Sequence, residues 1–168
     1  MDQNQWQLLA TKRFLPLFLT QFLGALNDNV FKNALVILIT YATIDSAGFS
    51  SQIMVTLAAA IFILPFFLFS ATAGQLADKW NKAKLISIVK SIEILLMGSA
   101  AVGFLLGNTI FLLCILFLMG TQSAFFGPLK YSILPDHLQD HELISGNALI
   151  EAGTFLSILL GTILGGLL

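Results

Sequence analysis

Several polar side chains interrupt a long apolar stretch near the amino terminus, which runs from Phe14 to Tyr41. Gln21, Asp28 and Lys32 recur at the spacing that puts side chains on one face of an α-helix. At a rise of about 1.5 Å per residue, Asp28 lies roughly 20 Å along such a helix from Phe14. That position is near the middle of a bilayer, where a carboxylate is costly unless it meets water or a partner. The stripe therefore predicts the wall of a polar pathway.

A simpler interpretation of the same residues is a structural ion pair between Asp28 and Lys32, four positions apart. The two interpretations are compatible, because a paired carboxylate can still face a pathway. Lys90 and Glu93 lie three positions apart in a later apolar run. We expect these two to pair with each other and not to form a binding site.

Composition places the chain in a membrane. Hydrophobic residues make up 57% of the 168 residues and charged residues only 10%, whereas soluble domains carry about 25% charged residues. A net charge of -1 without basic clusters gives no basis for nucleic-acid binding. The single cysteine, Cys114, excludes a disulfide within the chain. The sequence shows no nucleophile–base set and no glycine-rich phosphate loop, so we expect neither an enzyme nor a cofactor.

The apolar runs predict an all-α, polytopic membrane protein, because each run has the length of about 20 residues that a spanning helix needs. Basic residues occur in every other connection between the runs, and these connections lie on the same side of the membrane. The residues are Lys12, Arg13, Lys79, Lys82, Lys84 and Lys130. The opposite connections, 43–51 and 107–108, contain no Lys or Arg, which predicts a cytoplasmic amino terminus. The five expected spans are about 14–41, 52–73, 85–106, 109–128 and 145–168.

The last run carries small residues every four positions, at Gly153, Ser157, Gly161 and Gly165. Such a face allows close contact with another helix, and we expect part of that neighbour to lie beyond residue 168. No polar or basic flank follows the final glycines. We therefore interpret the chain as the amino-terminal piece of a longer transporter.

Two histidines, His137 and His141, have a spacing that could ligate a metal on a helix. They belong to a polar connection, 129–144, in which such residues are ordinary, and no third ligand is defined. We therefore expect no metal site.

The segment from Gly74 to Lys84 reads GQLADKWNKAK. It resembles the G-x-L-a-D-r-x-g-r-k signature between the second and third helices of the major facilitator superfamily, although Asn81 and Lys82 replace the terminal glycine and arginine. The resemblance implies a cytoplasmic gating loop in which Gly74, Asp78 and Lys82 take part. Topology alone would explain the lysines but not the order of glycine, leucine, alanine and aspartate.

Three further blocks extend the resemblance. QFLGALNDNVFKNAL (21–35), FFGPLKYSILPDHL (125–138) and GNALIEAGTFLSILLGTILGG (146–166) resemble the lysophospholipid transporters of that superfamily. The implied activity is the inward movement of 2-acyl-glycerophosphoethanolamine and related lipids across the bacterial inner membrane. The first block is most similar to forms fused to an acyltransferase and an acyl-carrier-protein synthetase, which would lie after residue 168.

The resemblance implies functional roles for Asp28, Lys130 and Glu151. A zwitterionic headgroup needs an anionic site for its ammonium, such as Asp28, and a cationic site for its phosphate, such as Lys130. Snorkelling to the membrane boundary explains Lys130 equally well. Glu151 could pair with Lys130 or Lys90, or relay protons. Neutral hydrogen bonds could come from Gln21, Asn29 and Asn147.

The expected function is lysophospholipid transport by alternating access, and the missing carboxy-terminal helical bundle would supply the other half of the site. Two alternatives stay open. One is a facilitator for another small solute, and the other is a membrane anchor for a fused lipid acyltransferase. Apart from the lysophospholipid, the bilayer and this missing bundle, the sequence indicates no further partner.

Overall fold

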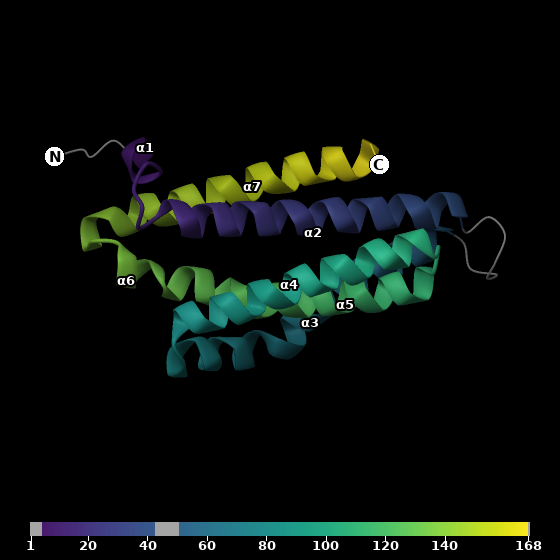
Figure 1. Cartoon of the computed structure of the whole chain (residues 1–168), viewed down its shortest axis with the longest axis horizontal. Helices are drawn as coiled ribbons and strands as arrows, with labels where there is room; N and C mark the ends of the chain where they lie inside the picture. Colours follow the sequence, from purple (N-terminus) through teal and green to yellow (C-terminus); the bar gives the residue numbers. More distant parts are fainter. Residues whose placement is uncertain (1–4, 43–50, 168) are drawn as a thin grey trace. The chain divides into compact units, whose positions relative to one another are not determined.

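The computed structural model describes residues 5–42 and 51–167, and these ranges contain helices and no strand. Within them, five helices are long and apolar enough to cross a membrane, which confirms the predicted class. The five are α2 (Leu15–Ala42), α3 (Ser51–Lys79), α4 (Lys82–Leu105), α5 (Thr109–Ser132) and α7 (Leu143–Leu167) (Figure 1). Shorter elements are α1 (Gln5–Leu8), α6 (Leu134–His137) and the 3-10 turn η1 (Asp140–Glu142). Most of the predicted connection 43–51, and Leu168, lie outside the described residues.

The expected loop 74–84 is mostly helical. Helix α3 continues through Gly74 and Asp78 to Lys79, and α4 begins at Lys82, so only Trp80 and Asn81 join the two helices. The segment is rich in good helix formers, and leaving the hydrocarbon does not by itself end a helix. The Asn81 side chain caps α4, because its Oδ1 accepts a hydrogen bond from the Lys84 backbone N–H at 3.0 Å.

Helix α5 also continues past its expected end. It includes Pro128 and ends at Ser132, so Lys130 lies in the last turn of a helix and not in a connection.

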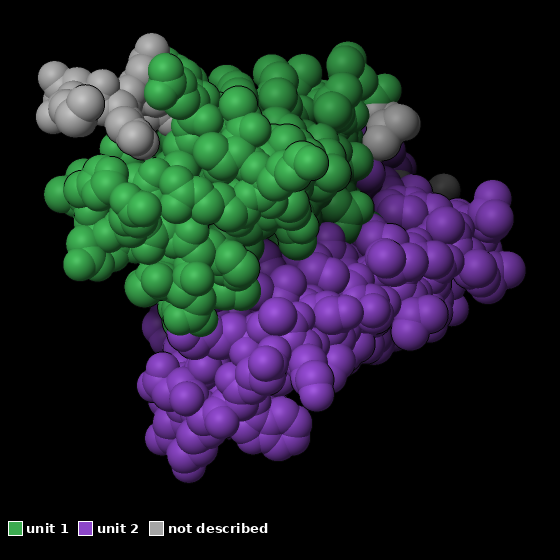
Figure 2. Space-filling view, turned by 60° about the vertical axis from the view of Figure 1, so that its left-hand side comes forward, with its two compact units in different colours: residues 1–33, 130–168 green, residues 34–129 purple. Residues whose placement is uncertain are grey.

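The chain forms two compact units, coloured separately in Figure 2. Unit 1 comprises residues 1–33 and 130–168, and unit 2 comprises residues 34–129.

In unit 1, helices α2 and α7 lie side by side and run in the same direction (Figure 1). The contacts pair residues that rise in number together on the two helices: Gly153 with Phe18, Gly161 with Leu26, and Gly165 with Val30. A methyl group at Gly161 would lie 2.7 Å from the Leu26 carbonyl oxygen, so a larger residue does not fit without movement. The neighbour of the small-residue face is therefore α2 of this chain.

One end of unit 1 is held by an apolar cluster and an ion pair. The cluster contains Leu8, Phe14, Leu134, Leu138, Leu149 and Ile150. Beside it, Arg13 Nη2 donates to Glu142 Oε1 at 2.5 Å, and Arg13 Nη1 donates to the His137 carbonyl oxygen at 3.4 Å. The other carboxylate oxygen of Glu142 accepts from the Gln139 backbone N–H at 2.9 Å. Arg13 thus fixes the start of α2 to the connection before α7.

Unit 2 packs α3, α4 and α5 around an apolar cluster of Ala77, Leu85, Val89, Phe126 and Leu129. Where α3 meets α5, Gly120 lies against the Phe62 carbonyl group and the ring of Pro65. Pro65 lies inside α3, whose ribbon changes direction along its length (Figure 1). The turn between α4 and α5 uses Gly107 at a φ of 61°, a conformation that favours glycine.

The contact between α2 and α7 predicts different changes in stability when two glycines of α7 are replaced. Gly161→Ala should destabilise the protein by about 1–2 kcal/mol, because the overpacking penalty exceeds the gain in helix propensity. Gly166→Ala is the matched control, since nothing lies within 4 Å of a methyl group there. Thermal unfolding in detergent measures both. Equal melting temperatures for the two variants would contradict the close packing.

Candidate functional site

All six residues predicted to bind substrate lie in unit 1. Helix α2 carries Gln21, Asp28 and Asn29, the last turn of α5 carries Lys130, and α7 carries Asn147 and Glu151. The structure brings some of these side chains together and separates others along the helix axis.

Lys130 and Glu151 are brought together. Lys130 Nζ lies 3.9 Å from Glu151 Oε1, and the two side chains are 12% and 43% exposed. The Tyr131 hydroxyl donates a hydrogen bond to the same carboxylate oxygen. The Lys130 ammonium also lies 4.8 Å from the centroid of the Tyr131 ring. This group, which we call the Lys130 cluster, therefore offers a cation and a carboxylate at one partly exposed place.

Gln21 joins α2 to α7. Its side chain is buried, and Nε2 donates to Thr154 Oγ1 at 2.8 Å. Asn29 is buried as well, and its Nδ2 donates to the Ala25 carbonyl oxygen at 2.8 Å. These bonds satisfy polar groups where the two helices meet, which is a structural role that the sequence did not assign to them.

Asp28 lies one turn before Lys32, and the two charges interact, as the spacing of four predicts. Lys32 Nζ also donates to Asn29 Oδ1 at 3.0 Å. The Asp28 side chain is half-buried. Beside it, Asn27 Nδ2 is buried and has no hydrogen-bond partner among the residues that the structure describes. This part of α2 is therefore polar and only partly shielded.

The structure separates Asp28 from the Lys130 cluster. Asn29, next to Asp28, contacts Gly161 of α7. Gly161 and Glu151 are ten positions apart on α7, which corresponds to about 15 Å along the axis. A single small headgroup therefore does not reach both carboxylates at once in this conformation.

Asn147 lies one turn before Glu151 on α7 and is exposed. Its Nδ2 donates to the Leu143 carbonyl oxygen of its own helix at 2.9 Å. The predicted gating residues lie in unit 2, where Asp78 is exposed and a methyl group at Gly74 would meet nothing within 4 Å. The gating role of Gly74, Asp78 and Lys82 therefore stays a prediction.

A second charged group, which we call the Glu93 clamp, lies in unit 2. Lys90 Nζ lies 2.6 Å from Glu93 Oε2, which confirms the predicted pair. Gln122 Nε2 of α5 donates to the same oxygen at 2.7 Å, and the Lys90 ammonium lies 4.1 Å from the Phe126 ring centroid. Glu93 is only 8% exposed. The clamp therefore joins α4 to α5 within the bundle.

Sequence reasoning missed Tyr131, Thr154 and Gln122. Gln122 is a long polar residue inside an apolar run, and that contrast alone was a usable signal. Tyr131 directly follows Lys130, but adjacency does not indicate which carboxylate its hydroxyl reaches.

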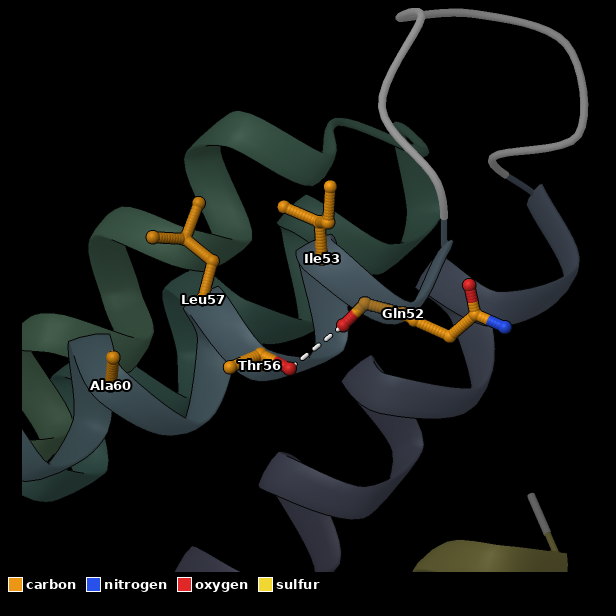
Figure 3. Close-up of a pocket in the computed structure, with 5 residues that line it drawn as sticks. All are labelled: Gln52, Ile53, Thr56, Leu57 and Ala60. Carbon is orange, nitrogen blue, oxygen red and sulfur yellow. Dashed lines mark hydrogen bonds between the residues drawn. The ribbon is translucent and has the colours of Figure 1, made fainter.

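Two apolar grooves lie on unit 2 and contain none of the predicted site residues. One has a volume of about 400 Å³ and is formed by the first turns of α3 (Figure 3). There Ile53 and Leu57 point to the same side, and Thr56 Oγ1 donates to the Gln52 carbonyl oxygen at 2.9 Å. The other, of about 440 Å³, includes Cys114. Among the described residues, no three His, Cys, Asp or Glu side chains are grouped to hold a metal.

Comparison with known proteins identifies a family over most of the chain. The sequence model described as Major Facilitator Superfamily matches residues 17–168. No solved structure matches the chain.

Several curated relatives share one name. The lysophospholipid transporter LplT of Escherichia coli (strain SE11) is 29% identical over 164 residues, which is 95% of this chain and 37% of that protein. Proteins of the same name from Escherichia coli O1:K1 / APEC and from Shigella boydii serotype 18 have the same identity and coverage. The chain thus spans just over a third of the length of these relatives.

The Glu93 clamp predicts that a single substitution lowers the stability of the protein much more than a double substitution does. Glu93→Ala should cost about 3 kcal/mol of stability, because the Lys90 ammonium would stay in an apolar place without its carboxylate. The double variant Lys90→Met/Glu93→Met removes both charges and should recover most of that loss. Thermal unfolding in detergent compares the two. A double variant as unstable as Glu93→Ala would contradict the ion pair as the cause.

Proposed function

Because the chain belongs to the major facilitator superfamily, we propose that the protein moves lysophospholipids across a membrane by alternating access. Relatives named lysophospholipid transporters align with 95% of the chain, which supports this substrate class. In transporters built from paired helical bundles, the substrate lies near the midplane between the bundles. The five long helices would form one wall of the pathway, and a second bundle of helices would form the other.

The observation that carries the proposal is the pairing of Lys130 with Glu151. A phosphoethanolamine headgroup holds an anionic phosphate close to a cationic amine. Two opposite charges 3.9 Å apart can receive both groups at once, with the phosphate at Lys130 and the ammonium at Glu151. Lysine binds phosphate as a point charge and does not require the planar geometry of arginine. The acyl chain would remain in the apolar surroundings.

Asp28 takes a second role in this proposal. Since it lies about 15 Å from the level of Glu151 along the helices, it would receive the headgroup ammonium at a different stage of the transport cycle. At that stage, Lys32 would bind the phosphate and Asn29 would form a hydrogen bond with the ester. A charged residue at mid-depth in a helix is costly without such a role or a partner. Asp28 has Lys32 as a partner, and the proposal also gives it a functional role.

For the orientation, we propose a cytoplasmic amino terminus in a bacterial inner membrane. The support is the basic side chains near Arg13, Lys82 and Lys130, compared with the uncharged turn at 107–108. This orientation would place the Lys130 cluster toward the cytoplasmic half of the membrane, and Asp28 nearer the middle.

Uptake into proteoliposomes tests the proposed substrate. The full-length protein should transport lysophosphatidylethanolamine and should not transport soluble sugars or amino acids. Lys130→Gln and Glu151→Gln should each reduce the initial rate about tenfold, as expected when a charge-assisted hydrogen bond of roughly 1.5–3 kcal/mol is lost. Asp28→Asn should reduce it as well, with the protein still inserted.

The matched control for Lys130→Gln is Lys84→Gln, because Lys84 is exposed near the start of α4. This control should transport at the rate of the unchanged protein. Transport of a soluble solute without transport of the lysolipid would exclude the proposal. If Lys130→Gln took up the lysolipid at the full rate, the proposed role of Lys130 in binding the phosphate would be contradicted.

The proposed orientation predicts which short turns react from outside the cell. With Cys114 replaced by serine, a cysteine at position 108 should react with a membrane-impermeant maleimide in intact cells. A cysteine at position 81 should react only after the membrane is permeabilised. The opposite pattern of labelling would show that the amino terminus faces outward.

A further inference from the structure

The pairing within the Lys130 cluster is incomplete. The 3.9 Å between Lys130 Nζ and Glu151 Oε1 exceeds the range of about 2.7–3.2 Å for an N–H···O hydrogen bond. The Glu93 clamp provides the comparison inside the same chain, because there Lys90 Nζ lies 2.6 Å from the carboxylate oxygen. In the Lys130 cluster, the charges attract one another but the ammonium does not donate to the carboxylate.

Tyr131 anchors the carboxylate in this cluster. Its hydroxyl donates to Oε1 of Glu151, the same oxygen that faces Lys130. In the Glu93 clamp, a neutral amide and a lysine both donate to one oxygen. At Glu151 only the hydroxyl donates, and the carboxylate would have to give up that hydrogen bond to move onto the ammonium. The Lys130 ammonium donates no hydrogen bond to any residue in the described part of the chain, although its side chain is only 12% exposed.

A shielded ammonium that donates no hydrogen bond to the described residues is suited to an anion. Burial strengthens its attraction for a negative group, and the nearby Glu151 carboxylate offsets its charge when no anion is bound. We propose that Tyr131 is a positioning residue for the headgroup phosphate. By holding Glu151 away from Lys130, it keeps the ammonium free to donate to that phosphate. This inference rests on the proposed function and adds to it the residue that sets phosphate recognition.

The proposal predicts the effect of removing one oxygen atom. Tyr131→Phe keeps the ring beside Lys130 but removes the donor to Glu151, so the carboxylate can move onto the ammonium as in the Glu93 clamp. Binding of lysophosphatidylethanolamine to the full-length protein in detergent should weaken roughly tenfold. Binding of a monoacylglycerol with the same acyl chain, which has no phosphate, should not change. The control is Tyr41→Phe, because Tyr41 is the other tyrosine and is 76% exposed.

A double-variant cycle separates positioning from a merely structural effect. In a Glu151→Gln background, no carboxylate competes for Lys130, so adding Tyr131→Phe should not weaken lysolipid binding further. An equal loss in both backgrounds would overturn the proposal. A loss shared by the monoacylglycerol, or no loss at all in Tyr131→Phe, would also overturn it.

Two further measurements identify the ligand. Displacement of the lysolipid by millimolar inorganic phosphate would indicate a site for the free anion and would contradict the assignment to a lipid headgroup. If the unchanged protein does not bind lysophosphatidylethanolamine, both the proposed function and this inference fail. If the unchanged protein binds the lipid and Tyr131→Phe binds it equally well, only this inference fails.

Discussion

Hydrocarbon offers no hydrogen bonds, and this constraint explains how the polar side chains between the helices are arranged. Glu93 is almost fully buried and accepts from both Lys90 and Gln122. Gln21 is buried and reaches Thr154 on another helix. Because an unsatisfied polar group is so costly in lipid, these bonds specify which helix faces lie against each other. The few charged residues of the chain therefore contribute to its architecture more than their number suggests.

Helix association in a membrane also requires that the helices approach each other closely. Lipid tails are as apolar as leucine, so helices in a membrane associate through packing and polar contacts and not through exclusion of water. Gly161 and Gly165 let α7 approach the backbone of α2. Gln21 then lies near enough to donate to Thr154, and Asn29 packs against Gly161. Small residues and hydrogen bonds thus act together in unit 1, since the short distance allowed by glycine makes the polar contacts possible.

The Glu93 clamp and the Lys130 cluster illustrate how a structural ion pair differs from a candidate binding site. The Glu93 clamp has short bonds that converge on one buried oxygen. The Lys130 cluster has a longer separation and a half-exposed carboxylate. A headgroup that entered the clamp would have to replace strong existing bonds, whereas one that reached Lys130 would find unused donors. Incomplete pairing in a costly place is what supports a functional role, and charge alone does not.

The sequence by itself determined the number of long helices and the Lys90–Glu93 pair, because hydropathy, helix length and the spacing of three are local properties. Local patterns also indicated that α7 needs a close neighbour and that Asp28 lies beside Lys32. Only the tertiary structure decided that α2 is that neighbour, that Gln122 reaches Glu93 and Tyr131 reaches Glu151, and that Asp28 and Glu151 are separated along the helix axis. The bond from Gln21 to Thr154 joins positions 133 residues apart. Such contacts depend on how whole helices pair, and a periodic pattern within one helix carries no information about its partner's register.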